Sequence, residues 1–292
     1  MLQQEIPVVR SADRATAPRT LRAAFTPDPD DAYAWWALAT GRIRVGDFRM
    51  EISTSHIQDI NEACLRDEYD IGAISSAAYP ALSRNYAILS SGASVGRGYG
   101  PALATKNLQP SDLNRDVMVA IPGELTTGAL LLRLFFPSVK TIAMRFDEIA
   151  PAIIDGRVDA GVLIHEELLN WSAAGLRRLV CLGKKWTEET GMPIPVGLNV
   201  VHRRHGAAAI SRISAAIRQS MVEADANERE ATAWAMKYSR EAEPQIGGRF
   251  MKMFANKDTL QLDEECLSAM RTLFEKGYNR GLIVCIPKVE TV

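Results

Sequence analysis

The sequence VMVAIPGELTTGALLLRLFF, at residues 117–136, decides which fold this chain is expected to adopt. Its first five residues are apolar, which predicts a buried strand. Pro122 and Gly123 then predict a turn, and the apolar residues 128–136 predict a helix. A strand that passes through a short turn into a helix is the basic unit of an α/β protein.

Similar units are expected on both sides of this stretch. Apolar runs predict further strands at residues 21–25, 49–52, 70–75, 87–89, 101–105, 141–145 and 158–164. Helical spacing predicts helices at residues 32–40, 56–67 and 149–154, and after residue 200 at 210–221, 234–238 and 266–274. Asp30 or Asp31 is the expected N-cap of the first helix, and Asp147 that of the third. The alternation predicts an α/β sandwich with parallel strands.

Composition excludes several classes of protein. The chain has 292 residues, enough for about two domains. Its 34 Lys and Arg residues balance 35 Asp and Glu residues, which excludes the overall basic charge of many nucleic-acid-binding proteins. Four cysteines far apart in sequence predict reduced thiols and no zinc site. No apolar run approaches the roughly 18 residues of a membrane helix, and residues 1–22 do not resemble a secretory signal, so we expect a cytoplasmic protein.

The turn before residue 128 is a candidate anion site. Backbone N–H groups at a helix start have no partner within the helix, and the helix dipole favours an anion there. Thr126 and Thr127 add hydroxyl groups, and Gly128 lets a ligand approach the backbone. A carboxylate or phosphate is the expected ligand. The alternative is that Thr126 only caps the helix, and spacing alone does not decide between the two.

His165 follows the apolar strand at 158–164, at the edge of the sheet where α/β proteins bind ligands. Imidazole has a pKa of about 6.5 and can act as a base near neutral pH. A single histidine is more often structural, so position alone does not establish catalysis. Glu166 should point to the opposite face and is not expected to pair with His165. No Ser-His-Asp triad can be assembled from the sequence.

Two loops carry charged residues. Residues 90–101 contain four glycines, and Arg97 among them could bind an anion or be solvated. The acidic turn, residues 28–31, has three carboxylates that could bind a metal. A turn with a helix cap is the stronger interpretation, because no further ligand lies nearby in the sequence.

Six segments occur in the same order as in one known family. They are TPDPDDAYAWWAL, DIGAISSAAY, LSSGASVGRGYGP, AIPGELTTGALLL, DAGVLIHE and WTEETGMPIPVG. The chain resembles the menaquinone-biosynthesis proteins of the futalosine pathway over roughly residues 21–202. Within that family it is more similar to the 1,4-dihydroxy-6-naphthoate synthases than to the chorismate dehydratases.

The resemblance implies a two-lobed fold like that of class II periplasmic binding proteins, with a ligand cleft between the lobes. Residues 1–112 and 197–292 would form the first lobe, and residues 113–196 an inserted second lobe. The family's activity would make the chain a lyase that releases 1,4-dihydroxy-6-naphthoate from cyclic dehypoxanthinylfutalosine, with no metal or cofactor.

The resemblance also implies roles for residues. His165, in the family's Ile-His-Glu motif, would remove a proton from the substrate. Thr127 and Gly128, with Thr126 beside them, would hold the substrate carboxylate. The remaining expected contacts with this small, acidic aromatic or nucleoside-derived substrate are Ser75, Ser76, Asp30 and Arg97.

Four positions depart from the family pattern. The first motif is usually Cys-Pro-Asn-Asp, where this chain has Asp28, Pro29, Asp30 and Asp31. Ala73 and Ala77 stand where the family carries a lysine and often a histidine. These departures leave open a diverged paralogue, a solute-binding protein or a cytosolic sensor for a related acid. No nucleic-acid or membrane partner is expected, and a homodimer is left open.

Overall fold

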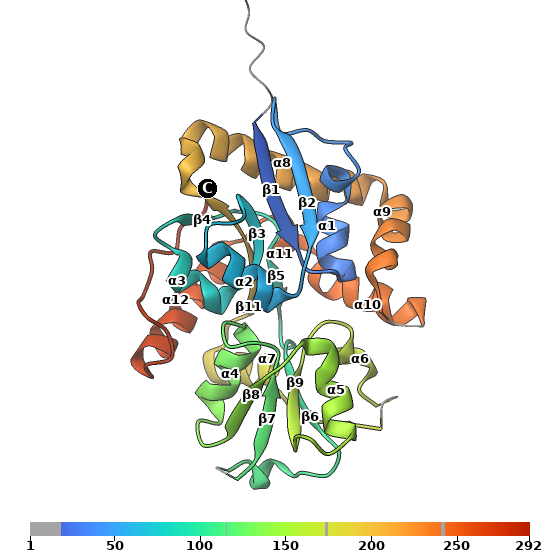
Figure 1. Cartoon of the computed structure of the whole chain (residues 1–292), viewed down its shortest axis with the longest axis vertical. Coiled ribbons are helices and arrows are strands. Elements are labelled where there is room, and N and C mark those ends of the chain that lie inside the picture. Colours follow the sequence, from blue (N-terminus) through green and yellow to red (C-terminus); the bar gives the residue numbers. More distant parts are fainter. Residues whose placement is uncertain (1–18, 115, 173–174, 241–242) are drawn as a thin grey trace, which may run out of the picture.

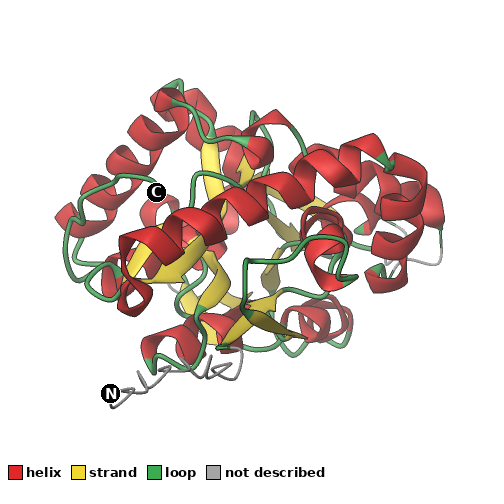
Figure 2. Ribbon diagram, turned by 90° about the horizontal axis from the view of Figure 1, so that it is seen from above, coloured by secondary structure: helices red, strands yellow, loops and turns green. Residues whose placement is uncertain are grey.

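The computed structural model describes residues 19–292 except 115, 173–174 and 241–242. The chain folds into two lobes, one above the other, each built on its own β-sheet (Figure 1). Seen from above, helices surround the strands (Figure 2). The α/β architecture that the sequence predicts is therefore confirmed.

The first sheet has six strands, in the order β2-β1-β3-β11-β4, with β5 also paired to β11. Their bounds are Thr20–Phe25 (β1), Arg49–Thr54 (β2), Ile71–Ser75 (β3), Tyr86–Ile88 (β4), Ser94–Gly96 (β5) and Ile194–His202 (β11). β1 runs parallel to β2 and β3, as expected. β11 runs antiparallel to β3, β4 and β5, so the prediction of parallel strands was wrong for this part of the sheet. Strand direction is set here by pairing between residues about 100 or more positions apart, which local patterns do not contain.

Most helices of the first lobe come from the two ends of the chain. They are Pro29–Ala39 (α1), Ile57–Leu65 (α2), Tyr79–Leu82 (α3), Gly206–Ala226 (α8), Glu228–Ala235 (α9), Pro244–Phe254 (α10), Lys257–Leu260 (α11) and Glu264–Asn279 (α12). α1 packs against α8 and α9 and buries Trp35 and Trp36. Its N-cap is Asp28 rather than Asp30 or Asp31, because Pro29 occupies the first helical position and starts the helix earlier.

The second sheet has five strands, in the order β10-β6-β9-β7-β8. Its strands are Ala102–Thr105 (β6), Met118–Ile121 (β7), Lys140–Ala143 (β8), Ala160–Leu163 (β9) and Arg177–Cys181 (β10); its helices are Thr127–Phe135 (α4), Phe146–Ile154 (α5), Glu167–Asn170 (α6) and Leu182–Thr190 (α7). β7 is parallel to β8 and β9, whereas β6 is antiparallel to β9 and β10. Arg145 is the N-cap of α5, so Asp147 lies in the first turn instead of capping the helix.

The boundary expected between residues 112 and 113 lies too late in the chain. β6 forms its hydrogen bonds with β9 and β10, so the chain already belongs to the second lobe at residue 102. It returns through β11, whose first residue, Ile194, pairs with Gly96 of β5. The short apolar sequence of β6 does not indicate which sheet the strand joins, because that depends on partners far away in the chain.

Apolar packing continues from one lobe into the other. α12 of the first lobe contacts both β11 and α4, and one apolar cluster contains Ile74, Leu131 and Phe274. Within the described part of the chain, no helix combines the length and the apolar character needed to cross a membrane.

Candidate active site

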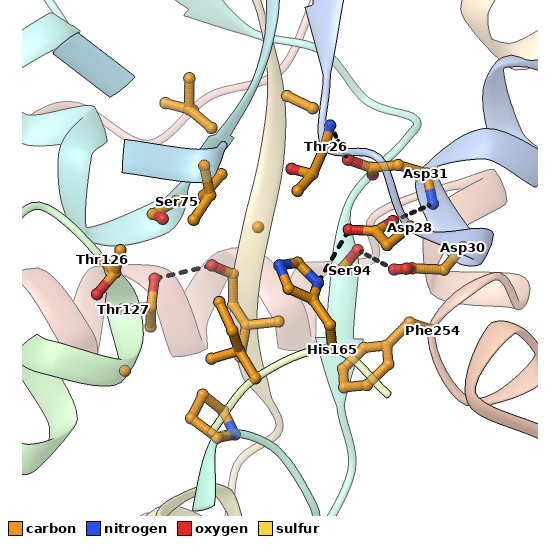
Figure 3. A pocket seen from close by; sticks show the side chains of 18 of the residues that line it. Thr26, Asp28, Asp30, Asp31, Ser75, Ser94, Thr126, Thr127, His165 and Phe254 are labelled. Atoms are coloured by element: carbon orange, nitrogen blue, oxygen red, sulfur yellow. Dashed lines mark hydrogen bonds and ion pairs between the residues drawn. The ribbon is translucent and has the colours of Figure 1, made fainter. Parts of the chain in front are cut away.

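A pocket lies between the two lobes (Figure 3). The space inside it is about 680 Å³, open solvent at its mouth included. The residues from the ends of β1, β3 and β5 form one wall, and those at the ends of β7 and β9 form another. The polar residues that line it are Thr26, Asp28, Asp30, Asp31, Ser75, Ser94, Thr126, Thr127 and His165.

His165 comes directly after β9 and its side chain is only 12% exposed. Its φ of +55° turns the chain into the left-handed region, which is uncommon for a residue other than glycine. Nδ1 lies 2.9 Å from Oδ2 of Asp28, whereas Nε2 is buried and has no hydrogen-bond partner. In Figure 3 the ring presents its free edge to the side of the pocket with Ser75 and Thr127.

The surroundings of His165 favour the neutral imidazole. Burial, together with the positive charge of Arg240, lowers the pKa of His165, although three nearby carboxyls act in the opposite direction. The ring packs edge-on against Phe146, with 4.7 Å between ring centroids. A neutral ring that donates Nδ1–H to Asp28 has a lone pair at Nε2, and such a nitrogen can accept a proton from a bound molecule.

The acidic turn lies beside His165. Asp28 caps α1 by accepting the N–H of Asp31 at 3.1 Å, and Asp31 accepts the N–H of Thr26 at 3.0 Å. Asp30 accepts from the hydroxyl of Ser94 at 3.1 Å with Oδ2, while its Oδ1 is buried without a partner. Burial raises the pKa of all three carboxyls, that of Asp31 to about 8, and their mutual repulsion adds to the effect. The turn therefore carries fewer than three negative charges near neutral pH.

The start of α4 faces His165 across the pocket. Thr126 caps the helix by accepting the N–H of Ala129, at 3.3 Å. The hydroxyl of Thr127 donates to the carbonyl of Val196 and accepts the N–H of Ala77, so it joins the two lobes. No hydrogen bond of the described chain uses the N–H groups of Thr127 and Gly128. These two N–H groups, rather than the Thr127 hydroxyl, are available to an anion.

Most of the residues expected to contact the substrate line the pocket, but Ser76 and Arg97 do not. Ser75 and Asp30 line the pocket, as do Thr126, Thr127, Gly128 and His165. Ser76 is completely buried and is not among the lining residues. Arg97 lies outside the lining and forms ion pairs with Asp258 at 2.8 Å and Glu265 at 2.6 Å. Its guanidinium is thus engaged by carboxylates of α11 and α12, and the structure gives no support for a substrate contact.

Sequence reasoning missed several lining residues. Ser94, Phe250 and Phe254 enter the pocket from β5 and α10. Asp28 was visible as part of the acidic turn, but nothing in the sequence connected it with His165, which lies 137 positions later. The expectation for Glu166 agrees with the structure. It does not pair with His165, and it accepts from the backbone N–H of Arg240 and from its guanidinium.

Among the residues that the structure describes, two groups of side chains could offer ligands to a metal ion. Asp28, Asp30 and Asp31 each have a carboxylate oxygen within 4.8 Å of the others, and the second group is Asp258, Asp263 and Cys266. Arg97 already balances the charge of the second group through Asp258 and Asp263. In the first group, protein donors occupy at least one oxygen of each carboxyl, and His165 lies against the second oxygen of Asp28, which agrees with the prediction of a turn and helix cap.

Known structures share the fold. A crystal structure of protein AF1704 from Archaeoglobus fulgidus is 36% identical, with a TM-score of 0.86 over 90% of this chain and 98% of that one. The alkanesulfonate-binding protein SsuA from Xanthomonas axonopodis is 14% identical, with a TM-score of 0.74 over 94% of this chain and 98% of that one. A Candida albicans protein described as having the periplasmic-binding-protein fold has a TM-score of 0.65. The two-lobed binding-protein fold is thereby confirmed.

Sequence relatives point to one pathway. A relative from Streptomyces coelicolor, named 1,4-dihydroxy-6-naphthoate synthase, is 33% identical over 90% of this chain and 95% of its own length. A relative of the same name from Thermus thermophilus is 30% identical over 92% of this chain and 97% of its own length. The sequence model of the menaquinone biosynthesis family matches residues 21–279. This chain is therefore an enzyme of the menaquinone biosynthesis family.

Proposed function

We propose that the chain is a lyase that converts cyclic dehypoxanthinylfutalosine to 1,4-dihydroxy-6-naphthoate in the cytoplasm. The names of the two relatives support this reaction. The observation that carries it is the placement of His165, whose unpartnered Nε2 faces the pocket opposite the free N–H groups of α4.

In this scheme a base lies at a fixed distance from the site that binds the substrate carboxylate. We assign the base to Nε2 of His165, since burial and Arg240 keep the imidazole neutral at pH 7. Removal of a proton from the substrate at this point would start the bond cleavage that releases the naphthoate. No cofactor is required by this scheme.

The substrate carboxylate would bind at the start of α4. The backbone N–H groups of Thr127 and Gly128 supply two donors, and the helix dipole adds a favourable field. With its carboxylate end bound at the start of α4, the substrate would place its other end against His165. Such orientation of the reacting group accounts for much of the catalysis in reactions that proceed without a cofactor.

The first experiment is incubation of the purified protein with cyclic dehypoxanthinylfutalosine, with mass-spectrometric detection of 1,4-dihydroxy-6-naphthoate. We expect product from the wild type and a loss of turnover of at least about 100-fold for His165→Ala. Circular dichroism of the variant shows whether the fold is kept. Equal turnover by both proteins would remove His165 from its role, and no product from the wild type would contradict the reaction.

A second candidate is favoured by the four departures from the family pattern. Ala73 lines the pocket, and Asp28 and Asp30 add carboxyls to it. A paralogue that acts on another small aromatic or nucleoside-derived acid would retain the anion site and His165. Tight binding of the futalosine substrate without product would support this alternative.

A further inference from the structure

A nitrogen atom lies within hydrogen-bond distance of each oxygen of Asp28. Oδ1 accepts the backbone N–H of Asp31 at 3.1 Å, and Oδ2 lies 2.9 Å from Nδ1 of His165. The side chains of Asp28 and His165 are 3% and 12% exposed, so little water competes for this contact. A buried carboxylate with donors on each side is well placed to retain its charge.

The other carboxyls of the acidic turn do not have the same support. Asp30 has one protein donor, Ser94, and its Oδ1 is buried without a partner. Its contact with Asp28 raises the pKa of Asp30 and lowers that of Asp28, although burial, the largest effect, raises both. With a nitrogen within reach of each oxygen, Asp28 is better placed than Asp30 to hold a negative charge.

A charged Asp28 determines which nitrogen of His165 is protonated. A carboxylate can only accept, so Nδ1 must carry the hydrogen and Nε2 must carry the lone pair. The opposite tautomer would leave a lone pair facing a carboxylate and would place a hydrogen where the substrate is expected. The second arrangement cannot act as a base at Nε2.

We propose that Asp28 is a positioning residue for His165, holding the ring in the tautomer whose Nε2 lone pair faces the substrate. The proposal rests on the proposed function in one respect, namely that His165 is the base. The competing explanation is that Asp28 serves only as the N-cap of α1. The two explanations differ in what an asparagine at this position would do.

Asp28→Asn separates capping from positioning. Asn caps helices as well as Asp does, so its oxygen can still accept the N–H of Asp31. Its NH₂ group then lies at Nδ1 of His165 and donates to it, which forces the hydrogen to Nε2. We expect kcat to fall by about 100-fold or more with little change in KM, since the corresponding substitution in a Ser-His-Asp triad costs about 10⁴-fold.

Nitrogen-15 NMR of the histidine rings measures the tautomer without any substrate. The His165 signals are assigned by their absence from His165→Ala. We expect hydrogen at Nδ1 in the wild type and at Nε2 in Asp28→Asn. A second variant, Asp28→Ser, keeps a good cap with a side chain too short to reach Nδ1, and should show a mixture of tautomers with intermediate kcat.

Asp263→Asn is the matched control. Asp263 caps α12 by accepting the N–H of Cys266 at 2.9 Å, and it does not line the pocket. This variant should keep the wild-type tautomer and kcat. An Asp28→Asn protein with the wild-type tautomer, or with the other tautomer and unchanged kcat, would overturn the proposal. If the wild type makes no naphthoate, the proposed function fails, and a wild-type hydrogen at Nε2 would separately refute the positioning role.

Discussion

The three carboxyls of the acidic turn lie close together, and their repulsion raises the free energy of the ionised form of each. For Asp31, burial and the neighbouring Asp30 raise the pKa from 3.8 to about 8. The folded protein therefore holds a proton that the unfolded chain releases near pH 4. The contribution of protonated Asp31 to the free energy of unfolding is full below pH 3.8 and is lost as the pH rises toward 8.

Asp31→Asn should consequently stabilise the protein, and more so at high pH. The amide oxygen can still accept the N–H of Thr26, so the turn keeps its hydrogen bond. We expect the free energy of unfolding at pH 8 to rise by about 1–2 kcal/mol relative to the wild type, and to change little at pH 4. Urea unfolding at the two pH values measures this difference. A variant that is less stable than the wild type at pH 8 would contradict it.

The start of α4 combines a structural and a binding role within one element. Gly128 has room for a hydrogen only, because a Cβ there would lie 2.9 Å from Cγ1 of Val162 and 3.4 Å from Cβ of Pro101. Both neighbours are held in place by the second sheet and the crossing segment. A larger residue would therefore move the start of the helix and, with it, the N–H groups that face the pocket.

Gly128→Ala should raise KM for the proposed substrate about tenfold and lower the free energy of unfolding by about 1–3 kcal/mol. Gly248→Ala is the matched control, since a Cβ at Gly248 of α10 meets nothing within 4 Å. That change should leave KM unaltered and be neutral or slightly stabilising, because Ala favours a helix. Unchanged KM in Gly128→Ala would argue against an anion site at α4.

Substitutions of Thr126 measure how much the N-cap of α4 contributes to stability. Its hydroxyl accepts the N–H of Ala129 and donates to the carbonyl of Gly123 at 2.8 Å. Thr126→Ala should reduce the free energy of unfolding by about 1 kcal/mol, whereas Thr126→Ser should retain most of it. Urea unfolding of both variants is the measurement. Equal losses for Ala and Ser would show that the methyl group, and not the cap, matters.

At the scale of the whole molecule, a histidine joins the two lobes. His56, the N-cap of α2, accepts the N–H of Phe146 at the start of α5 with Nε2, at 2.8 Å. The two rings also stack, with 4.7 Å between centroids. Burial, aided by Arg145, lowers the pKa of His56 to about 4 against the opposing effect of Asp59. The contact therefore depends on a neutral ring.

Acid should weaken this connection. His56 contributes stability above pH 6.5 that is lost as the pH falls toward 4, because the unfolded chain binds the proton first. We expect a loss of about 1–2 kcal/mol between pH 7 and pH 4 from this residue. The Gln side chain of His56→Gln has an oxygen that can accept the same hydrogen bond and does not titrate. Between pH 7 and pH 4 the free energy of unfolding of this variant should therefore fall by about 1–2 kcal/mol less than that of the wild type. Parallel pH dependences for the two proteins would refute the role of His56.

How far the sequence predicts this molecule depends on the range of the interactions. The strand–turn–helix at 117–136 and the position of His165 at a strand end follow from local patterns, and the structure agrees with both. The reversed direction of β11 and the membership of β6 in the second sheet depend on pairings far apart in the chain. The same holds for the ion pairs of Arg97 and for the contact between Asp28 and His165.

The left-handed backbone of His165 also guides structural work on the bound state. At a φ of +55°, alanine carries a strain of about 1–2 kcal/mol that asparagine largely avoids. His165→Asn, unlike His165→Ala, would remove the imidazole without adding conformational strain at the end of β9. It is therefore the better inactive protein for co-crystallisation, since intact substrate can be trapped and imaged in a pocket whose walls stay in place.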